Sequence, residues 1–187
     1  MKGDWCYWNR YFSKEQCEFI LEQGLKITPQ DAGLGTEGIK DESRRSKIRW
    51  IYPNNPDFQF VFDALWKTAI SSNRDWFNFH ITNLPFIQLA EYDESYQGEY
   101  RRHHDVLWMN DSEYHRKLTC VIQLSDPITY DGGDFEIFVK QQPDNKEAMR
   151  DQGTAIFIPS FVYHQANPVT RGTRYSLTAW FEGPKWR

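Results

Sequence analysis

The chain has 187 residues, a formal net charge of −4 and 17% aromatic residues. This length suits one domain with a substantial buried core, and the acidic balance excludes a general attraction to nucleic acid or anionic lipid. Cys6, Cys17 and Cys120 include no CxxC pair, so we expect reduced, buried thiols rather than disulfides or a zinc knuckle. The sequence has no apolar leader and no stretch long enough to cross a bilayer, which predicts a soluble cytoplasmic protein without a membrane partner.

Two helices are predicted in the first half of the chain. The first begins with a capping box of Ser13 and Gln16 and ends at Gly24. The second follows Asn55-Pro56, which supply a cap and a first-turn proline. Its apolar side chains recur at three and four residues, which predicts a stripe packed on a sheet: Phe58, Val61, Phe62, Leu65, Trp66, Ala69 and Ile70.

Two further segments lie between these helices. Residues 28–43 are rich in Gly, Asp, Glu and Thr, and their G-x-G lacks the flanking strand and helix of a phosphate-binding turn, so we expect a mobile loop. Residues 44–52, RRSKIRWIY, alternate in character and predict a strand with one basic face. We expect that face to be solvated; the alternative is a patch for an acidic partner.

Beyond Leu84 the helical periodicity disappears and short strand-like runs follow one another, separated by turn signals. This pattern favours an antiparallel sandwich or barrel. The fold class is therefore mostly β with flanking helices (α+β). Strands are expected at 85–92, around His103, and at 117–124, 134–139, 154–159 and 174–181.

The stretch 99–106, EYRRHHDV, holds the strongest candidate for a metal site. Side chains alternate on an extended segment, so His103 and Asp105 share one face while His104 points away. His164, at the end of IPSFVYH, is the best candidate for a remote ligand. Two histidines and one carboxylate on one face of a metal are typical of non-haem Fe(II) oxygenases, in which the opposite face stays open. The other two histidines are not expected to bind metal: His80, as packing or surface, and His115, in an exposed polar loop.

The predicted last strand, RYSLTAWF, places Arg174, Ser176, Thr178 and Trp180 on one face. A buried guanidinium without a partner costs several kcal/mol, so this row favours an anionic ligand. A dicarboxylate fits, because arginine binds a carboxylate bidentately and Ser176 or Thr178 adds a hydroxyl donor. The alternative is that Arg174 lies on the outer face in a surface ion pair.

The motifs of the second half, in their order and spacing, resemble those of the 2-oxoglutarate- and Fe(II)-dependent dioxygenases, specifically the prolyl 4-hydroxylase-like branch. They are Tyr92, Gly98 and Tyr100 before His103-x-Asp105, then Thr119-Cys120, Gly132-Gly133, and His164 followed ten residues later by Arg174. The resemblance implies a double-stranded β-helix, a jelly-roll or cupin-like barrel supported by N-terminal helices. It implies a single oxygenase domain over 1–187, with supporting helices and strand in 1–84 and the catalytic barrel core in 85–187.

The same resemblance assigns two sets of residues. The iron ligands would be His103, Asp105 and His164. Arg174 would bind the distal carboxylate of 2-oxoglutarate, in a pocket completed by Tyr92, Gln123, Ser176, Thr178 and Trp180. Gln123 stands where some prolyl hydroxylases have a tyrosine, and it retains a hydrogen-bond donor. Fe(II) is the implied metal, with 2-oxoglutarate and dioxygen as cosubstrates and ascorbate as reductant.

The implied reaction is hydroxylation of a prolyl residue in a peptide or protein, with release of succinate and CO₂. Segments 28–43 and 108–116 would close over the substrate, with Trp108 and Tyr114 in contact with it. A nucleic-acid demethylase is disfavoured, because such enzymes have a second arginine where this chain has Trp180. Two alternatives are a cupin-like metalloenzyme that uses zinc, manganese or nickel and has no need of Arg174, and a catalytically silent binding domain. The sequence does not indicate an oligomeric state.

Overall fold

The computed structural model describes residues 1–32, 43–109, 111–141 and 146–187. The helical elements are α1 (Lys14–Leu25), η1 (Pro56–Phe58), α2 (Gln59–Ser72), η2 (Asn73–Phe77), η3 (Glu94–Tyr96) and η4 (Pro127–Thr129). The strands are β1 (Cys6–Trp8), β2 (Gln30–Asp31), β3 (Arg44–Arg45), β4 (Lys47–Ile51), β5 (Ile87–Asp93), β6 (Glu99–His103), β7 (Tyr114–Gln123), β8 (Asp131–Gly132), β9 (Phe135–Ile137), β10 (Ala155–Pro159), β11 (His164–Ala166), β12 (Val169–Arg171) and β13 (Thr173–Pro184).

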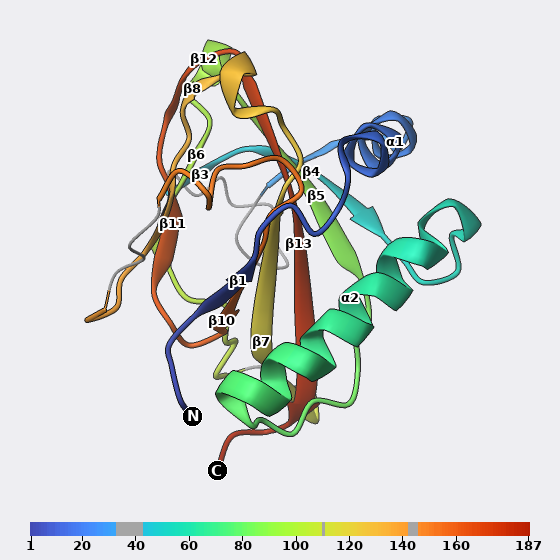
Figure 1. Cartoon of the computed structure of the whole chain (residues 1–187), viewed down its shortest axis with the longest axis vertical. Helices are drawn as coiled ribbons and strands as arrows, with labels where there is room; N and C mark the ends of the chain where they lie inside the picture. Colours follow the sequence, from blue (N-terminus) through green and yellow to red (C-terminus); the bar gives the residue numbers. More distant parts are fainter. Residues whose placement is uncertain (33–42, 110, 142–145) are drawn as a thin grey trace.

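Two antiparallel sheets make up most of the fold. The large sheet has the strand order β1-β10-β7-β13-β5-β4-β2, and the small sheet has the order β3-β6-β11-β9. A two-stranded sheet of β12 and β8 lies at one end (Figure 1). The two helices cover one side of the large sheet, and the small sheet lies on its other side (Figure 1). This arrangement confirms the predicted mostly β fold with flanking helices.

Both helices begin where their caps predict. The Ser13 side chain accepts from the Gln16 backbone and the Gln16 side chain accepts in return, which completes the capping box. Asn55 caps the turn that leads into α2. α1 ends at Leu25, one residue beyond the predicted end at Gly24, and a side chain at Gly24 would meet the end of the Leu89 side chain of β5. Glycine therefore allows a close approach of helix to sheet here.

The apolar stripes of these helices form the largest core with the outer face of the large sheet. Most of the predicted α2 stripe is buried, although Ile70 is 44% exposed. Leu177, Ala179 and Phe181 of β13 face this core, as strand alternation predicts. The three cysteines are free and buried, as expected.

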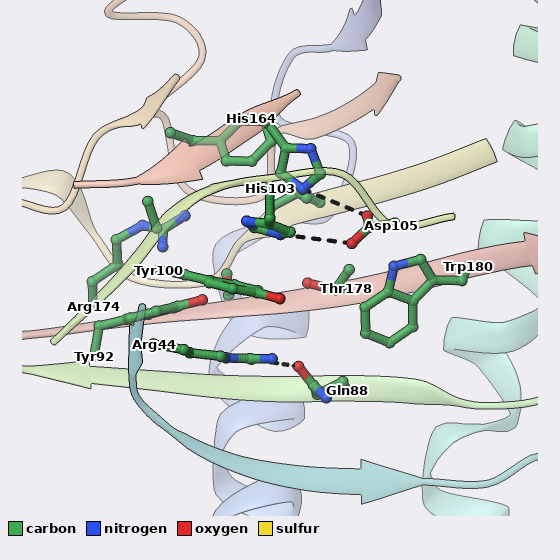
Figure 2. A pocket seen from close by; sticks show the side chains of 14 residues that line it. Arg44, Gln88, Tyr92, Tyr100, His103, Asp105, His164, Arg174, Thr178 and Trp180 are labelled. Carbon is green, nitrogen blue, oxygen red and sulfur yellow. Dashed lines mark hydrogen bonds and ion pairs between the residues drawn. The ribbon is translucent and has the colours of Figure 1, made fainter. Parts of the chain in front are cut away.

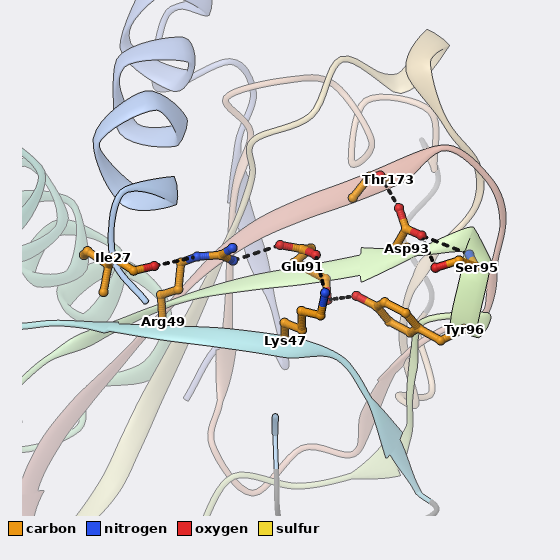
Figure 3. A network of polar contacts seen from close by, with 8 residues as sticks. All are labelled: Ile27, Lys47, Arg49, Glu91, Asp93, Ser95, Tyr96 and Thr173. Atoms are coloured by element: carbon orange, nitrogen blue, oxygen red, sulfur yellow. Dashed lines mark hydrogen bonds and ion pairs between the residues drawn. The ribbon is translucent and has the colours of Figure 1, made fainter. Parts of the chain in front are cut away.

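The predicted basic strand is divided between the two sheets, and its basic face is solvated only in part, because the Lys47 side chain is 46% exposed but Arg49 is buried. Arg49 is 6% exposed and forms a 2.9 Å ion pair with Glu91 of β5. It also donates to the Ile27 carbonyl, so β4 is joined to the end of α1 (Figure 3). Because a carboxylate and a carbonyl satisfy its donors, this guanidinium tolerates burial. Arg44 in β3 faces the space between the sheets.

Several short strands have no sequence signal of their own. β1 lies at the N-terminus and pairs with β10, and β11 starts at the predicted ligand His164. The expected mobile loop 28–43 lies mostly outside the described residues, apart from its first five positions and Ser43. Within the described ranges, no helix has the length and apolar character needed to span a membrane.

Candidate metal centre and pocket

His103 and His164 lie opposite each other on neighbouring strands of the small sheet. β6 and β11 are antiparallel, and their register pairs these two residues directly. Asp105 follows the end of β6, where its backbone N–H donates to the Ser160 carbonyl at 2.8 Å. The Nε2 atoms of His103 and His164 lie 3.6 and 3.5 Å from the two Asp105 carboxylate oxygens (Figure 2). One ligand atom of each residue lies within 4.8 Å of the others, which is compact enough for one metal ion.

Backbone carbonyls orient both imidazole rings. The Nδ1 atom of His103 lies 2.8 Å from the Arg101 carbonyl, and that of His164 lies 3.0 Å from the Val162 carbonyl. A carbonyl oxygen accepts only, so each Nδ1 carries a proton, and in the neutral ring each Nε2 presents a lone pair. Both lone pairs are thus available to a metal.

The electrostatics of the centre favour the metal-binding forms of its ligands. Burial, and then the charge of His164, lower the pKa of His103 to about 4, so its ring is neutral at neutral pH. Burial acts to raise the pKa of Asp105, but His164, His103, Arg116 and the hydrogen bond from Thr119 together more than offset it, and the pKa is lowered. The carboxylate is therefore ionised at neutral pH.

A β-bulge brings Tyr100 into the site. His164 pairs with His103 but Ala166 pairs with Tyr100, so three residues of β6 span two of β11. The extra residue turns Tyr100 to the same side as His103, and their rings stack with centroids 3.4 Å apart. Simple alternation would place these two side chains on opposite faces, which is why the sequence did not reveal Tyr100 as a neighbour of the metal.

Arg174 lies across the pocket from the histidines and is 1% exposed (Figure 2). Its Nη2 donates to the Gln123 side chain at 2.8 Å, its guanidinium lies 5.4 Å from the Tyr92 ring centroid, and its Nε has no hydrogen-bond partner. No described carboxylate forms an ion pair with it. A buried cation with one neutral acceptor is unfavourable by itself, so the environment favours an anionic ligand. The alternative of a surface ion pair on the outer face is wrong.

The pocket gathers most of the residues predicted for it. It is lined by Arg44, Gln88, Tyr92, Tyr100, His103, Asp105, Val121, Phe135, His164, Ala166, Arg174, Ser176, Thr178 and Trp180. Gln123 is absent from this lining, and its amide oxygen accepts from Arg174, so it orients the arginine. Gln88 precedes Tyr92 by four residues on β5, a spacing that marks a shared strand face.

His80 and His115 do not belong to the metal-binding cluster. His80 is exposed, which is one of the two placements expected for it. The prediction of an exposed loop for His115 is wrong, because β7 begins at Tyr114 and His115 is 5% exposed. Its Nδ1 accepts from the Trp186 backbone. Trp108 and Tyr114, predicted to contact a substrate, are 49% and 43% exposed.

The donor set suits the iron and cosubstrate that the sequence implies. Two neutral imidazoles and one carboxylate are the ligands of non-haem Fe(II) sites with open positions. The unpartnered Nε of Arg174 lies in the same pocket, where it suits a carboxylate. Metal ligands and anion site thus line one pocket between two sheets.

Comparison with known proteins agrees with this geometry. The model of the 2OG-Fe(II) oxygenase superfamily matches residues 87–182, about half of the chain. The chain belongs to this superfamily. The matched region includes every residue of the pocket lining except Arg44.

Curated relatives include PKHD-type hydroxylases. That of Pseudoalteromonas atlantica is 34% identical over 93 residues, which are 46% of this chain and 40% of the relative. One from Escherichia coli is 29% identical over 107 residues, which are 55% and 44% of the two chains. This chain therefore spans about two fifths of the length of the curated relatives it matches.

Solved structures of similar fold include prolyl hydroxylases. A Pseudomonas putida prolyl-4-hydroxylase has a TM-score of 0.74 at 19% identity, over 97% of this chain and 94% of that one. A Trichoplax adhaerens prolyl hydroxylase in complex with a hypoxia inducible factor peptide fragment also has a TM-score of 0.74, at 18% identity over 95% and 83% of the two chains. These similarities show the fold, the double-stranded β-helix of 2-oxoglutarate oxygenases.

Proposed function

We propose that this chain is an Fe(II)- and 2-oxoglutarate-dependent dioxygenase that hydroxylates a prolyl residue in a peptide or protein, with release of succinate and CO₂. The observation that carries the proposal is the placement of Arg174 in the same buried pocket as His103, Asp105 and His164. A metal site alone fits many reactions. The Arg174 guanidinium, whose Nε has no hydrogen-bond partner among the described residues, adds a specific place for the second carboxylate of 2-oxoglutarate.

His103, Asp105 and His164 would hold the iron, which supplies the redox chemistry with dioxygen and 2-oxoglutarate when bound. Carbonyl-fixed rings and an ionised carboxylate keep these three ligands ready without reorganisation. Ascorbate would serve as the reductant that maintains ferrous iron.

The cosubstrate would be oriented by residues of three adjacent strands. Arg174, fixed by Gln123, would bind its distal carboxylate, and hydroxyls of Tyr92, Ser176 and Thr178 line the same pocket. Trp180, 5% exposed, would form the wall that excludes water. The proposal of a prolyl substrate is supported by the names of the structural relatives, one of which was solved with a peptide.

The test is succinate formation. Anaerobically purified protein is given Fe(II), 2-oxoglutarate and oxygen, with and without proline-containing peptides, and succinate is measured together with a one-oxygen mass gain of the peptide. His103→Ala should abolish both products. Arg174→Lys keeps the charge but loses the planar fork, so the KM for 2-oxoglutarate should rise by roughly tenfold or more.

Arg171→Lys is the matched control, because this arginine is exposed and pairs with Asp131 away from the pocket. It should behave as wild type. The proposal is wrong if wild type makes no more succinate than His103→Ala under every peptide condition.

A further inference from the structure

Cationic side chains gather around the pocket. Arg44 and Arg174 line it, and the Arg116 guanidinium lies 4.0 Å above the ring of Trp180, another lining residue. Asp105 is the one carboxylate among the lining residues described. The pocket thus concentrates positive charge in a chain whose formal net charge is −4.

Arg44 is held in place by neutral groups. Its Nε donates to Ser46 at 2.9 Å, its Nη2 donates to Gln88 at 2.7 Å, and its guanidinium lies 4.4 Å from the Tyr100 ring centroid (Figure 2). None of the described residues accepts from Nη1 or forms an ion pair with Arg44. The contacts fix the orientation of the guanidinium, and no carboxylate among the described residues pairs with its charge.

Arg116, near the start of β7, has similar surroundings to Arg44. It stacks on Trp180, and no ion pair joins it to a carboxylate in the described part of the chain. Burial lowers the pKa of Arg116, and the charge of Arg44 adds to this, against the attraction of Asp105 and Glu182. Arg116 therefore adds a further positive charge beside Trp180, a lining residue of the pocket.

The charges of the metal and cosubstrate do not neutralise this pocket. With the proposed iron bound, the ion and three guanidiniums carry five positive charges, against two negative charges on 2-oxoglutarate, one on Asp105 and one on Glu182, which pairs with Arg116 in register across β7 and β13. One positive charge remains on the side of the pocket that holds Arg44 and Arg116. In a partly desolvated pocket such an excess strongly favours an anionic group.

We propose that the substrate is an acidic peptide, with a carboxylate side chain close to the target residue bound between Arg44 and Arg116. This inference rests on the proposed function and names its substrate class. A carboxylate accepts two parallel hydrogen bonds from a guanidinium, and both arginines are already oriented by ring stacking. The proposal also gives Arg44, which belongs to the strand expected to be basic, a role at the pocket.

Binding can be measured without turnover. Protein loaded with Zn²⁺ and 2-oxoglutarate is titrated with two fluorescein-labelled peptides of equal length, in which glutamate or glutamine flanks the proline, and anisotropy is recorded. The glutamate peptide should bind about tenfold tighter or more, since charge-assisted hydrogen bonds exceed neutral ones. The preference should shrink as ionic strength rises.

Arg44→Gln and Arg116→Gln should each remove most of this preference, and Arg171→Gln, an exposed control outside the pocket, should keep it. Thermal unfolding of each variant reports whether it folds. Arg44→Lys and Arg116→Lys retain the charge and should keep part of the preference.

Equal binding of the two peptides to wild type, or no measurable binding of either, overturns the inference. So does a preference that survives in both glutamine variants when they are folded. The succinate assay is separate: a protein that forms succinate but ignores peptide charge retains the proposed function and loses only this inference.

Discussion

A closed set of hydrogen bonds holds the Asp105 carboxylate. The Thr119 hydroxyl donates to it at 2.8 Å and also lies 3.0 Å from the Ser160 hydroxyl, and both residues are fully buried. The Ser160 carbonyl in turn accepts from the Asp105 backbone. The orientation of this ligand is therefore fixed by β7 and by the residue that follows β10, not by β6 alone.

Thr119→Val removes that hydroxyl with little change in shape, and it should weaken metal binding by about 10–100-fold, the usual cost of losing a partner of a metal ligand. Competition with a chromophoric chelator measures the affinity for Zn²⁺ or Fe²⁺. Thr68→Val is the control, since Thr68 is equally buried and its hydroxyl bonds to Ala64 within α2. Equal affinities of wild type and Thr119→Val would contradict this role.

Single residues of the site could be predicted where strand alternation alone determines the face on which a side chain lies. Alternation selects His103 over His104, and the row beginning at Arg174 shares one strand face; both arrangements are present in the structure. Tyr100 depends on a bulge, which arises from pairing with a strand more than sixty residues away. The position of Arg44 at the pocket depends on the division of one predicted strand between two sheets, with β3 in the small sheet and β4 in the large one.

At the scale of elements, the connection between β5 and β6 positions both sides of the pocket. It joins Tyr92 to Tyr100 through η3, and Asp93 fixes it by accepting from the Ser95 and Thr173 hydroxyls (Figure 3). Gly98 lies directly against the Tyr92 backbone: an added Cβ would be 2.6 Å from the Tyr92 Cα. Only glycine fits this approach without a backbone shift.

Gly98→Ala should therefore destabilise the fold by about 2–4 kcal/mol, because backbone rather than a flexible side chain must move. Urea unfolding measures the change. Gly24→Ala is the matched control: its methyl would meet only the end of the Leu89 side chain, and alanine gains about 1 kcal/mol of helix propensity. The explanation fails if the two alanine variants lose the same stability.

The existence of the elements was more predictable than their partners. Caps and apolar periodicity predict α1 and α2, and six strand-like runs correspond to β5, β6, β7, β9, β10 and β13. The short strands β1, β11 and β12 have three residues each, too few for a periodic signal. Their pairing is set by tertiary contacts that no local window contains.

At the scale of the whole molecule, the N-terminal residues are part of both sheets. β1, β2 and β4 extend the large sheet, and β3 adds Arg44 to the pocket through the small one. The expected supporting half therefore contributes directly to the site. We propose on this basis that residues 1–187 act as a single oxygenase domain.

The metal centre connects the two sheets. Two of its ligands come from β6 and β11 of the small sheet, and the third, Asp105, is bound by Ser160 and by Thr119 of β7 in the large sheet. An ion that binds only the folded chain adds about 2.7 kcal/mol of stability at a concentration 100 times its Kd. For a chain of this size that is a rise in Tm of about 5–10 °C. Differential scanning fluorimetry with Zn²⁺ or Mn²⁺, against EDTA, measures the shift.

Asp105→Asn should abolish this rise in Tm, since a neutral amide replaces the one carboxylate of the centre. In EDTA the Tm of this variant should stay close to that of wild type, because the two side chains are nearly isosteric. Asp111→Asn, an exposed acidic residue outside the cluster, should keep the full rise. A metal-induced shift of equal size in Asp105→Asn would show that the ion stabilises the protein from some other place. If the shift occurs only in the proteins with an intact cluster, the ion stabilises the fold through this site. The strands that supply the ligands then unfold together when the ion is lost.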